Sequence, residues 1–293
     1  MQSFAYAAPE TVKQALDVLA EHQSAGRRAQ VMAGGTDLLV QIRTLDGSPR
    51  TIVDIKKLAE TNRLDVGATE IYIGAAIPGA KLTASKPLAA CLPGLVEAID
   101  LIGSTQIQGR ASLGGNLCNA SPAGDTISAL VANAGVCVIA TPGGQRELPV
   151  EQFVVGVGKN ALKPGEFLLG LKFKRPAPRT GDAYLRFIPR TEMDIAVAGA
   201  GVSVTLDAKG VCTAARVAIG AVAPTVILVP AAAKALVGST LDAKALDTAG
   251  AACSAAASPI SDKRGTADYR RKVVAVLCKR ATNIAAERAK ESR

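Results

Sequence analysis

The sequence predicts a two-domain protein of mixed α and β structure, in which an α/β domain precedes a smaller α+β domain. Its 293 residues exceed what one average domain needs. Hydrophobic residues make up 48% of the chain but aromatic residues only 3%, so small side chains dominate and allow helices to pack closely on sheets. Residues 174–181 are basic, rich in proline and without periodicity, which predicts a linker. We therefore place the domains at 1–175 and 180–293.

Apolar periodicity and short apolar runs locate the elements of the first domain. Val12, Ala15, Leu16 and Leu19 recur at helical spacing and predict a helix from Thr11 to His22. The remaining predicted elements are helices over 38–43, 78–84, 93–102 and 126–133, strands over 29–33, 51–55, 71–73, 135–140 and 165–173, and a hairpin tip at 141–145.

The second domain reads as a run of strands followed by a run of helices, an order typical of α+β domains. Strands over 182–188, 195–206 and 214–221 predict a three-stranded antiparallel sheet. Helices are expected over 229–237, 243–257 and 269–288.

Two glycine-rich loops carry the functional signal: Ala33-Gly34-Gly35-Thr36-Asp37-Leu38-Leu39, and Ala111-Ser112-Leu113-Gly114-Gly115-Asn116 with its continuation to Asp125. Glycine lets a backbone turn sharply and approach a ligand, and consecutive amide groups in such a turn form an anion site. Two such turns would suit a dinucleotide. Neither matches a standard nucleotide motif, so each Gly-Gly can equally be a tight turn before a helix capped by Asp37 or Asp125.

The second loop carries a family resemblance. Thr105-Gln106-Ile107-Gln108-Gly109-Arg110-Ala111-Ser112-Leu113-Gly114-Gly115-Asn116, followed by Asn119-Ala120-Ser121-Pro122-Ala123-Gly124-Asp125, closely resembles the FAD-binding signature of the xanthine dehydrogenase and aerobic carbon monoxide dehydrogenase family. The first loop resembles the family's other FAD loop. Further landmarks, with which the likeness covers nearly the whole chain, are 51–55, 73–75, 190–196, 220–224 and 269–272.

This resemblance implies a medium subunit that carries non-covalent FAD. The fold would be a PCMH-type FAD-binding domain of two subdomains with FAD between them, followed by a C-terminal domain of the carbon monoxide dehydrogenase flavoprotein type. A large subunit would hold the molybdenum cofactor, a small one would carry two [2Fe–2S] clusters, and a dimer of heterotrimers is expected. The chain would be an oxidoreductase subunit that takes electrons from these clusters and passes them to an external acceptor.

The same resemblance implies the FAD-binding residues. Gly34, Gly35 and Thr36 would cradle one part of the diphosphate, and Ser112, Gly114, Gly115 and Asn116 the other. The remaining candidates line the groove or approach the cofactor: Ala33, Asp37, Leu38, Ile102, Arg110, Ala111, Asp125, Arg190 and Asp194.

Four of these candidates have a plain structural alternative. Arg110 would supply a positive charge, or form a surface ion pair. Asp125 would accept a hydrogen bond from the flavin or its ribityl chain, or cap the helix beginning at Thr126, and both roles are compatible. Arg190 and Asp194 would approach the flavin from the second domain, or pair with each other across a turn.

Other site chemistry is not expected in this chain. The six cysteines are scattered without a C-x-x-C pair, which argues against a metal or cluster site and against a disulfide framework. Some medium subunits hold an extra iron–sulfur cluster after the second loop, but Cys118 stands alone there. His22 is the only histidine, and no nucleophile–base pair is apparent, so we assign no catalytic residue. The flavin would perform the redox chemistry.

Charge and hydropathy limit the partners. The formal net charge is +9, but no aromatic residues interleave with the basic ones, so binding to nucleic acid is not expected. The basic residues would then form a solvated surface or a docking face for a partner subunit. No apolar stretch is long enough to span a bilayer, and the N-terminus lacks a signal-peptide pattern, so we expect a cytoplasmic protein. Two alternative functions are a self-sufficient flavin oxidase or reductase of related fold, and a basic assembly or nucleic-acid-binding subunit that has lost its flavin.

Overall fold

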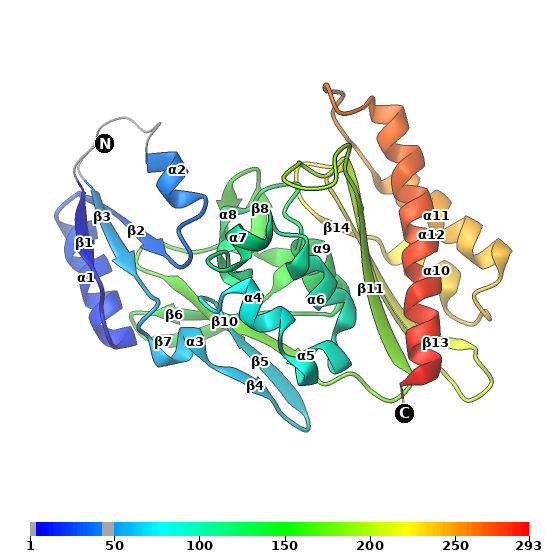
Figure 1. Ribbon diagram of the computed structural model, residues 1–293, viewed down its shortest axis with the longest axis horizontal. Helices are drawn as coiled ribbons and strands as arrows, with labels where there is room; N and C mark the ends of the chain where they lie inside the picture. The colour runs from blue at the N-terminus through cyan, green and yellow to red at the C-terminus, as the bar shows by residue number, and fades with distance from the viewer. Residues whose placement is uncertain (1–3, 43–49, 293) are drawn as a thin grey trace.

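Three β-sheets of three or more strands, each with helices packed on it, organise the part of the chain that the structure describes (Figure 1). The computed structural model describes residues 4–42 and 50–292. The first two sheets lie within residues 5–174 and the third within 180–228. The predicted combination of a two-part α/β domain and a smaller α+β domain is confirmed.

The first sheet is parallel and three-stranded, in the order β1 (Ala5–Ala7), β3 (Arg50–Asp54), β2 (Arg28–Met32). Helix α1 (Val12–Ser24) packs beside it, and its N-cap Thr11 forms a reciprocal capping box with Gln14. The short helix α2 (Leu38–Ile42) follows β2. Arg43, the last residue of the helix predicted here, lies outside the described residues.

The second sheet is antiparallel and five-stranded, in the order β4 (Leu64–Val66), β5 (Glu70–Gly74), β10 (Phe167–Lys174), β6 (Val136–Thr141), β7 (Gly144–Pro149). Its core includes the fully buried Phe153 and Phe173. The helices of this part are α3 (Ala59–Asn62), α4 (Gly79–Thr83), α5 (Lys86–Cys91), α6 (Pro93–Asp100), α7 (Thr105–Gln108), α8 (Leu113–Asn119) and α9 (Ile127–Ala132). A 3-10 turn (Val150–Gln152) leads into the small hairpin of β8 (Val154–Gly156) and β9 (Lys159–Asn160).

The C-terminal sheet contains the three predicted strands, β11 (Thr180–Phe187), β12 (Ala198–Leu206) and β13 (Cys212–Gly220). A two-residue fourth strand, β14 (Ile227–Leu228), extends it at the β13 edge, which corrects the predicted count of three. The helices are α10 (Pro230–Leu236), α11 (Ala243–Ala256) and α12 (Ala267–Glu291). The long α12 lies along β11 and β12 (Figure 1).

Both faces of the C-terminal sheet are covered, because α6 and α9 of the preceding domain pack against β11, β12 and β13. Glycines make this close approach possible. A Cβ atom on Gly94 of α6 would lie 2.6 Å from the Cα of Ala183, and one on Gly201 of β12 would lie 2.5 Å from the carbonyl oxygen of Ser128. The two domains are thus packed backbone to backbone.

Short elements account for most of what the sequence did not predict. Strands β1, β4 and β7 and helices α3, α5, α7 and α8 lie outside the predicted ranges. Each is eight residues or fewer, too short for apolar periodicity to be distinctive. Most of the second glycine-rich loop consequently forms the short helix α8, with α7 just before it.

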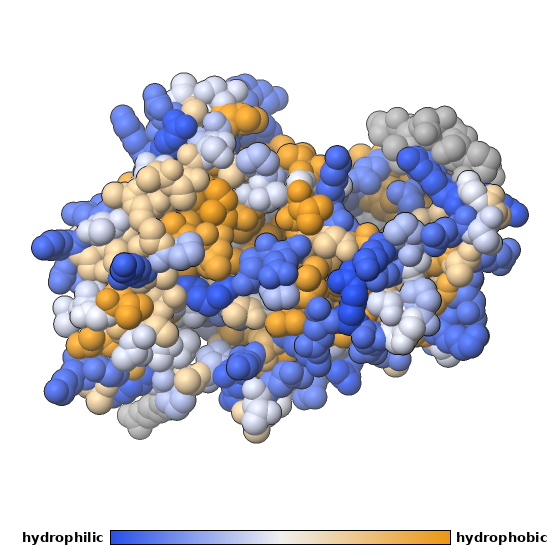
Figure 2. Space-filling model, turned by 180° about the vertical axis from the view of Figure 1, so that it is seen from behind, coloured by the Kyte–Doolittle hydropathy of each residue, from blue (hydrophilic) through white to orange (hydrophobic). Residues whose placement is uncertain are grey.

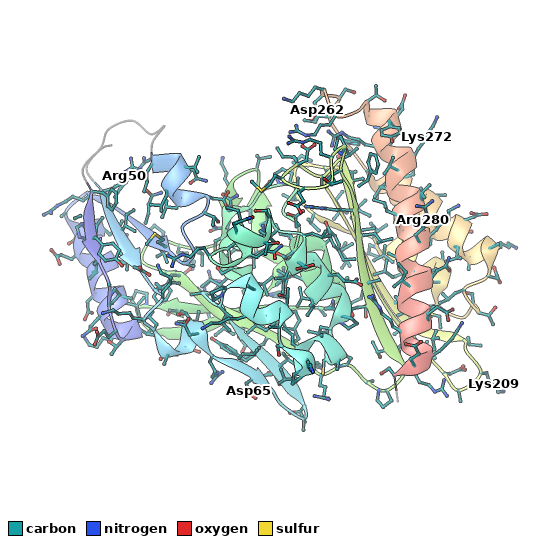
Figure 3. The ribbon with its side chains drawn as sticks, in the orientation of Figure 1. Arg50, Asp65, Lys209, Asp262, Lys272 and Arg280 are labelled. Atoms are coloured by element: carbon teal, nitrogen blue, oxygen red, sulfur yellow. The ribbon has the colours of Figure 1, made fainter. Side chains whose placement is uncertain are left out.

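The basic face predicted on the last helix is only partly solvated. Lys272 and Arg280 project from α12 into solvent (Figure 3). Arg270 is instead buried, and its guanidinium donates to the carbonyl of Val197 at 2.9 Å and to Asp262 at 2.7 Å.

Candidate functional site

The two glycine-rich loops meet in space at Gly34. A Cβ atom at that position would overlap the carbonyl group of Arg110, so only glycine allows the first loop to lie on the second. Gly114 is equally confined, since its Cβ would lie 2.6 Å from the Cβ of Ala75. Gly34 therefore lets the two loops touch, and Gly114 lets the second loop pack against the segment that follows β5.

A cleft of about 590 Å³ opens beside the two loops, a size typical of cofactor sites. All of the predicted binding residues line it except Arg110, Asp125, Arg190 and Asp194. The predicted residues in its wall are Ala33, Gly34, Gly35, Thr36, Asp37, Leu38, Ile102, Ala111, Ser112, Gly114, Gly115 and Asn116. The two glycine-rich segments, 33–38 and 111–116, thus share one wall although they are far apart in sequence.

The first loop connects the end of β2 to the start of α2. Gly35 adopts a φ of +80°, a left-handed conformation that favours glycine. Within the described chain, the amide groups of Gly34, Gly35 and Thr36 donate no hydrogen bond to another residue. Amides without a partner in a cleft are the expected state of an anion site before its ligand arrives.

The second loop leads into the N-terminus of α8. The hydroxyl of Ser112 caps this helix by accepting from the amide of Gly115 at 3.1 Å. The amides of Ser112 and Gly114 have no hydrogen-bond partner in the part of the chain that the structure describes. The amide oxygen of Asn116 accepts from the hydroxyl of Thr126 at 2.8 Å, which leaves the NH₂ group of Asn116 as its donor.

A third wall of the cleft, which the sequence did not reveal, runs from Gly158 to Leu168. Arg146 of β7 holds this segment by donating to Glu166 at 2.7 and 3.0 Å and to the carbonyl of Ala161 at 2.9 Å. The bond from Arg146 lowers the pKa of Glu166, against the effect of burial. The sequence signal that could have predicted this wall was the turn sequence Lys163-Pro164-Gly165. Lys163 also provides the cationic side chain among the described residues that line the cleft.

Asp125 does not cap a helix. The N-cap of α9 is Thr126, and the Asp125 carboxylate instead pairs with Arg186 of β11 at 2.5 Å. Burial raises the pKa of Asp125, while the charge of and hydrogen bond from Arg186 oppose that rise. This pair joins the end of the second loop region to the C-terminal sheet and lies outside the lining of the cleft.

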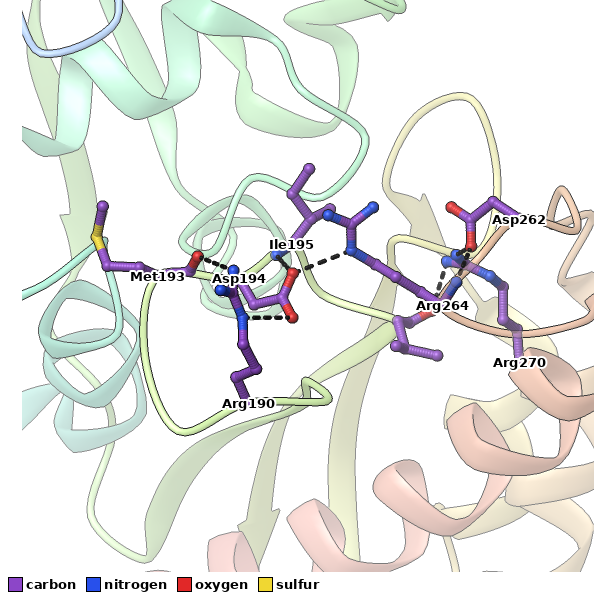
Figure 4. A network of polar contacts seen from close by, with 8 residues as sticks. Arg190, Met193, Asp194, Ile195, Asp262, Arg264 and Arg270 are labelled. Carbon is purple, nitrogen blue, oxygen red and sulfur yellow. Dashed lines mark hydrogen bonds and ion pairs between the residues drawn. The ribbon is translucent and has the colours of Figure 1, made fainter.

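Arg190 and Asp194 pair with each other, as the structural alternative predicted (Figure 4). The Nε of Arg190 lies 3.3 Å from Asp194, and Arg264 binds the other carboxylate oxygen at 3.0 Å. The hydrogen bonds from Arg264 and from the amide of Ile195 lower the pKa of Asp194. Both residues lie outside the cleft lining.

Two other predicted residues differ in their surroundings. Ile102 is buried and lines the cleft. The side chain of Arg110 is exposed, and only its carbonyl group meets the first loop.

Neither a reactive thiolate nor an imidazole lies in the described lining of the cleft. Cys118 lines it, but burial raises the pKa of this thiol to about 12, so the thiolate is not populated at neutral pH. His22 lies at the end of α1, with Nδ1 3.4 Å from the hydroxyl of Thr51. Among the described residues, no group of three His, Cys, Asp or Glu side chains is placed to hold a metal ion.

Comparison with protein families finds two matches that together span most of the chain. Residues 2–174 match the family described as the FAD binding domain in molybdopterin dehydrogenase. Residues 183–285 match the carbon monoxide dehydrogenase flavoprotein C-terminal domain.

Individual relatives cover the chain almost end to end. The carbon monoxide dehydrogenase medium chain of Afipia carboxidovorans is 32% identical over 289 residues, 98% of each chain. The nicotinate dehydrogenase FAD-subunit of Eubacterium barkeri is 32% identical over 216 residues, 73% of this chain and 72% of that one. A crystal structure of Cu,Mo-CO dehydrogenase superposes with a TM-score of 0.91 at 30% identity, covering 98% of this chain and 99% of the other.

Proposed function

Since this chain belongs to the family of FAD-binding subunits of molybdopterin dehydrogenases, we propose that it is the FAD-carrying electron-transfer subunit of a heteromeric molybdenum hydroxylase. FAD bound in the cleft would supply the redox chemistry, accepting electrons from [2Fe–2S] clusters of a partner subunit for delivery to an external acceptor. The chain's own task is then to bind and orient the cofactor.

The observation that carries this proposal is the set of unpartnered amides on two touching loops. The amides of Gly34, Gly35 and Thr36 belong to one loop and those of Ser112 and Gly114 to the other, and all five residues line one cleft. A diphosphate offers two anionic groups in series, so its length and charge suit two neighbouring sets of donors.

The residues divide the work of holding FAD. Gly34, Gly35 and Thr36 would bind one phosphate, and Ser112 and Gly114 the other. The amide of Gly115 already donates to the Ser112 hydroxyl. The role of Gly115 would be to leave the cleft wall free of a side chain at this position. The NH₂ group of Asn116 is the remaining donor.

The apolar lining supports the rest of the cofactor. Ala33, Leu38, Ile102 and Ala111 would pack against its rings and sugar. Asp37, whose pKa burial raises, lines the same wall as these side chains.

The residues outside the cleft stay predictions. Asp125 is placed by Arg186 rather than by a helix terminus, so its approach to the flavin would require the pair to act together. Arg190 and Asp194 are engaged with each other and with Arg264, and Arg110 presents a carbonyl rather than a charge to the first loop.

The proposed partners are a large molybdenum-cofactor subunit and a small subunit with two [2Fe–2S] clusters, arranged as a dimer of heterotrimers. Relatives carry the names medium chain and subunit.

The C-terminal domain leaves Val237 and Ile260 exposed, and apolar side chains gather over this half of the molecule when it is seen from behind (Figure 2). Exposed apolar area is typical of surfaces that contact partners. Within the described chain, no helix is long and apolar enough to cross a membrane.

Co-purification tests this function. A tagged copy isolated from its native host should bring down molybdenum, iron and FAD, and substrate turnover should require the partner subunits. The chain purified alone should be yellow and reduce or oxidise only artificial redox partners. If it elutes without molybdenum or iron and still oxidises a natural substrate, the self-sufficient flavoenzyme is the correct alternative.

A further inference from the structure

Lys56 lies directly behind the first glycine-rich loop, on the segment that follows β3. Its ammonium group donates to the carbonyl oxygen of Ala33 at 3.1 Å and to the carboxylate of Asp54 at 2.5 Å. The side chain is 26% exposed. A lysine therefore holds the first peptide group of the loop that would bind the cofactor.

Asp54 fixes Lys56 in turn. It is 5% exposed and accepts from the hydroxyl of Tyr6 at 2.6 Å as well as from the Lys56 backbone amide at 3.0 Å. Burial alone would raise the pKa of Asp54, but the bonds from Lys56 and Tyr6 hold it below its ordinary value. The carboxylate is thus charged at neutral pH, and the ammonium group has one defined position.

The geometry of a trans peptide connects Lys56 to the cleft. The Ala33 carbonyl and the Gly34 amide belong to the same planar group, in which the C=O and N–H bonds point in opposite directions. Described peptide bonds are trans. While Lys56 binds the carbonyl, the amide of Gly34 must point away from Lys56, and that amide has no partner in the described chain.

We propose that Lys56 is a positioning residue for the diphosphate of FAD. It fixes the Ala33–Gly34 peptide so that the Gly34 amide is presented to the anion, in a loop that contains no lysine or arginine. This inference rests on the proposed function, because it assumes that the first loop binds FAD.

The decisive comparison is between two adjacent lysines. Lys56→Met keeps the length of the side chain but removes its charge and its bond to Ala33. Lys57→Met makes the same change in net charge at an exposed position, where the lysine pairs with Glu10 at 3.1 Å. We expect Lys56→Met to weaken FAD binding by about ten- to a hundredfold, and Lys57→Met to stay within about twofold of the native protein.

Two readouts separate positioning from folding. Without FAD, Lys56→Met should melt at a lower temperature than Lys57→Met, because the buried Asp54 carboxylate loses its partner. The FAD dissociation constants, measured by flavin fluorescence titration at a temperature where circular dichroism shows both variants folded, should diverge. In the native protein, addition of FAD should shift the backbone amide resonance of Gly34 downfield and leave that of Gly210, in the turn between β12 and β13, unchanged. If Lys56→Met fails to fold, the double variant Asp54→Asn/Lys56→Met, which leaves no unpaired carboxylate, takes its place in the FAD titration and should show the same weakening relative to Lys57→Met.

The outcomes are distinct. If the native protein binds FAD and Lys56→Met binds it equally well, or if the Gly34 amide does not respond, Lys56 is not a positioning residue and the proposed function stands. Equal weakening by both substitutions would assign the effect to net charge and also overturn the inference. A native protein that binds no FAD would instead refute the proposed function.

Discussion

The carboxylate of Asp182, in β11, accepts a hydrogen bond from the amide of Gly94 at 3.0 Å, although the two residues are 88 positions apart. The same carboxylate accepts from Leu95 at 3.1 Å and from the side chain of Asn133 at 2.8 Å. A residue of the C-terminal domain thereby satisfies the N-terminus of α6, whose own N-cap, Leu92, provides no side-chain bond.

Asp182→Ala should destabilise the whole chain by about 2–4 kcal/mol, because it leaves several buried donors without an acceptor. Asp242→Ala is the matched control. Asp242 caps α11 within one domain and is exposed, so its loss should cost about 1 kcal/mol. Urea unfolding of both variants would measure the difference, and an Asp182 effect no larger than that of Asp242 would contradict this reading of the domain contact.

Gly34→Ala should abolish measurable FAD binding, since its Cβ would force the two loops apart at Arg110. Gly109→Ala is the control from the neighbouring turn, where the nearest atom to a new Cβ lies 3.6 Å away. Flavin content after purification, read from absorbance, distinguishes the variants. Normal flavin content in Gly34→Ala would show that the contact between the loops is not needed for the site.

Glu166→Gln should weaken the fold in a pH-dependent manner. The folded-state pKa of Glu166 is lowered by Arg146, so the pair contributes its full stability above the ordinary glutamate pKa and loses it as pH falls through the lowered value. At pH 7 we expect a loss of about 1–2 kcal/mol for this largely buried pair, and a smaller loss in acid. Urea unfolding at pH 7 and pH 4 would test this, and a deficit that grows in acid would refute it.

Acid precipitation should release FAD into the supernatant. Cys118 is held as a thiol and His22 is not a lining residue of the cleft, so no suitable attachment group is present among the described residues there. Mass analysis of the supernatant should find FAD. Flavin that stays with the pellet, or FMN in its place, would overturn this expectation.

Local sequence was enough to predict the parts of the site that local backbone chemistry controls. The loops around Gly34 and Gly114 were recognisable because glycine marks positions where the backbone is crowded. Helices such as α1, α11 and α12 were found because apolar periodicity extends over several turns.

Contacts between segments that are far apart in sequence could not be predicted from local sequence patterns. A cap on the neighbouring helix was the structural alternative for Asp125, but its partner is Arg186, 61 residues away. The third wall depends on Arg146 reaching Glu166 across 20 residues, and nothing in the pattern of either segment specifies that meeting. Lys56 resembled any surface lysine, because its role arises from the approach of β2 to β3.

The sheet that is covered on both faces has a consequence for biosynthesis. Residues up to 174 leave the ribosome first, and the faces of α6 and α9 that later pack on the C-terminal sheet are then exposed to solvent. Those faces gain their cover only when β11, β12 and β13 have emerged, and the sheet is itself incomplete until α12, ending at Glu291, closes the other side. A nascent chain therefore exposes apolar helix or sheet surface while residues 175–293, about two-fifths of the chain, are synthesised, and a chain truncated after residue 174 would expose the helix faces permanently.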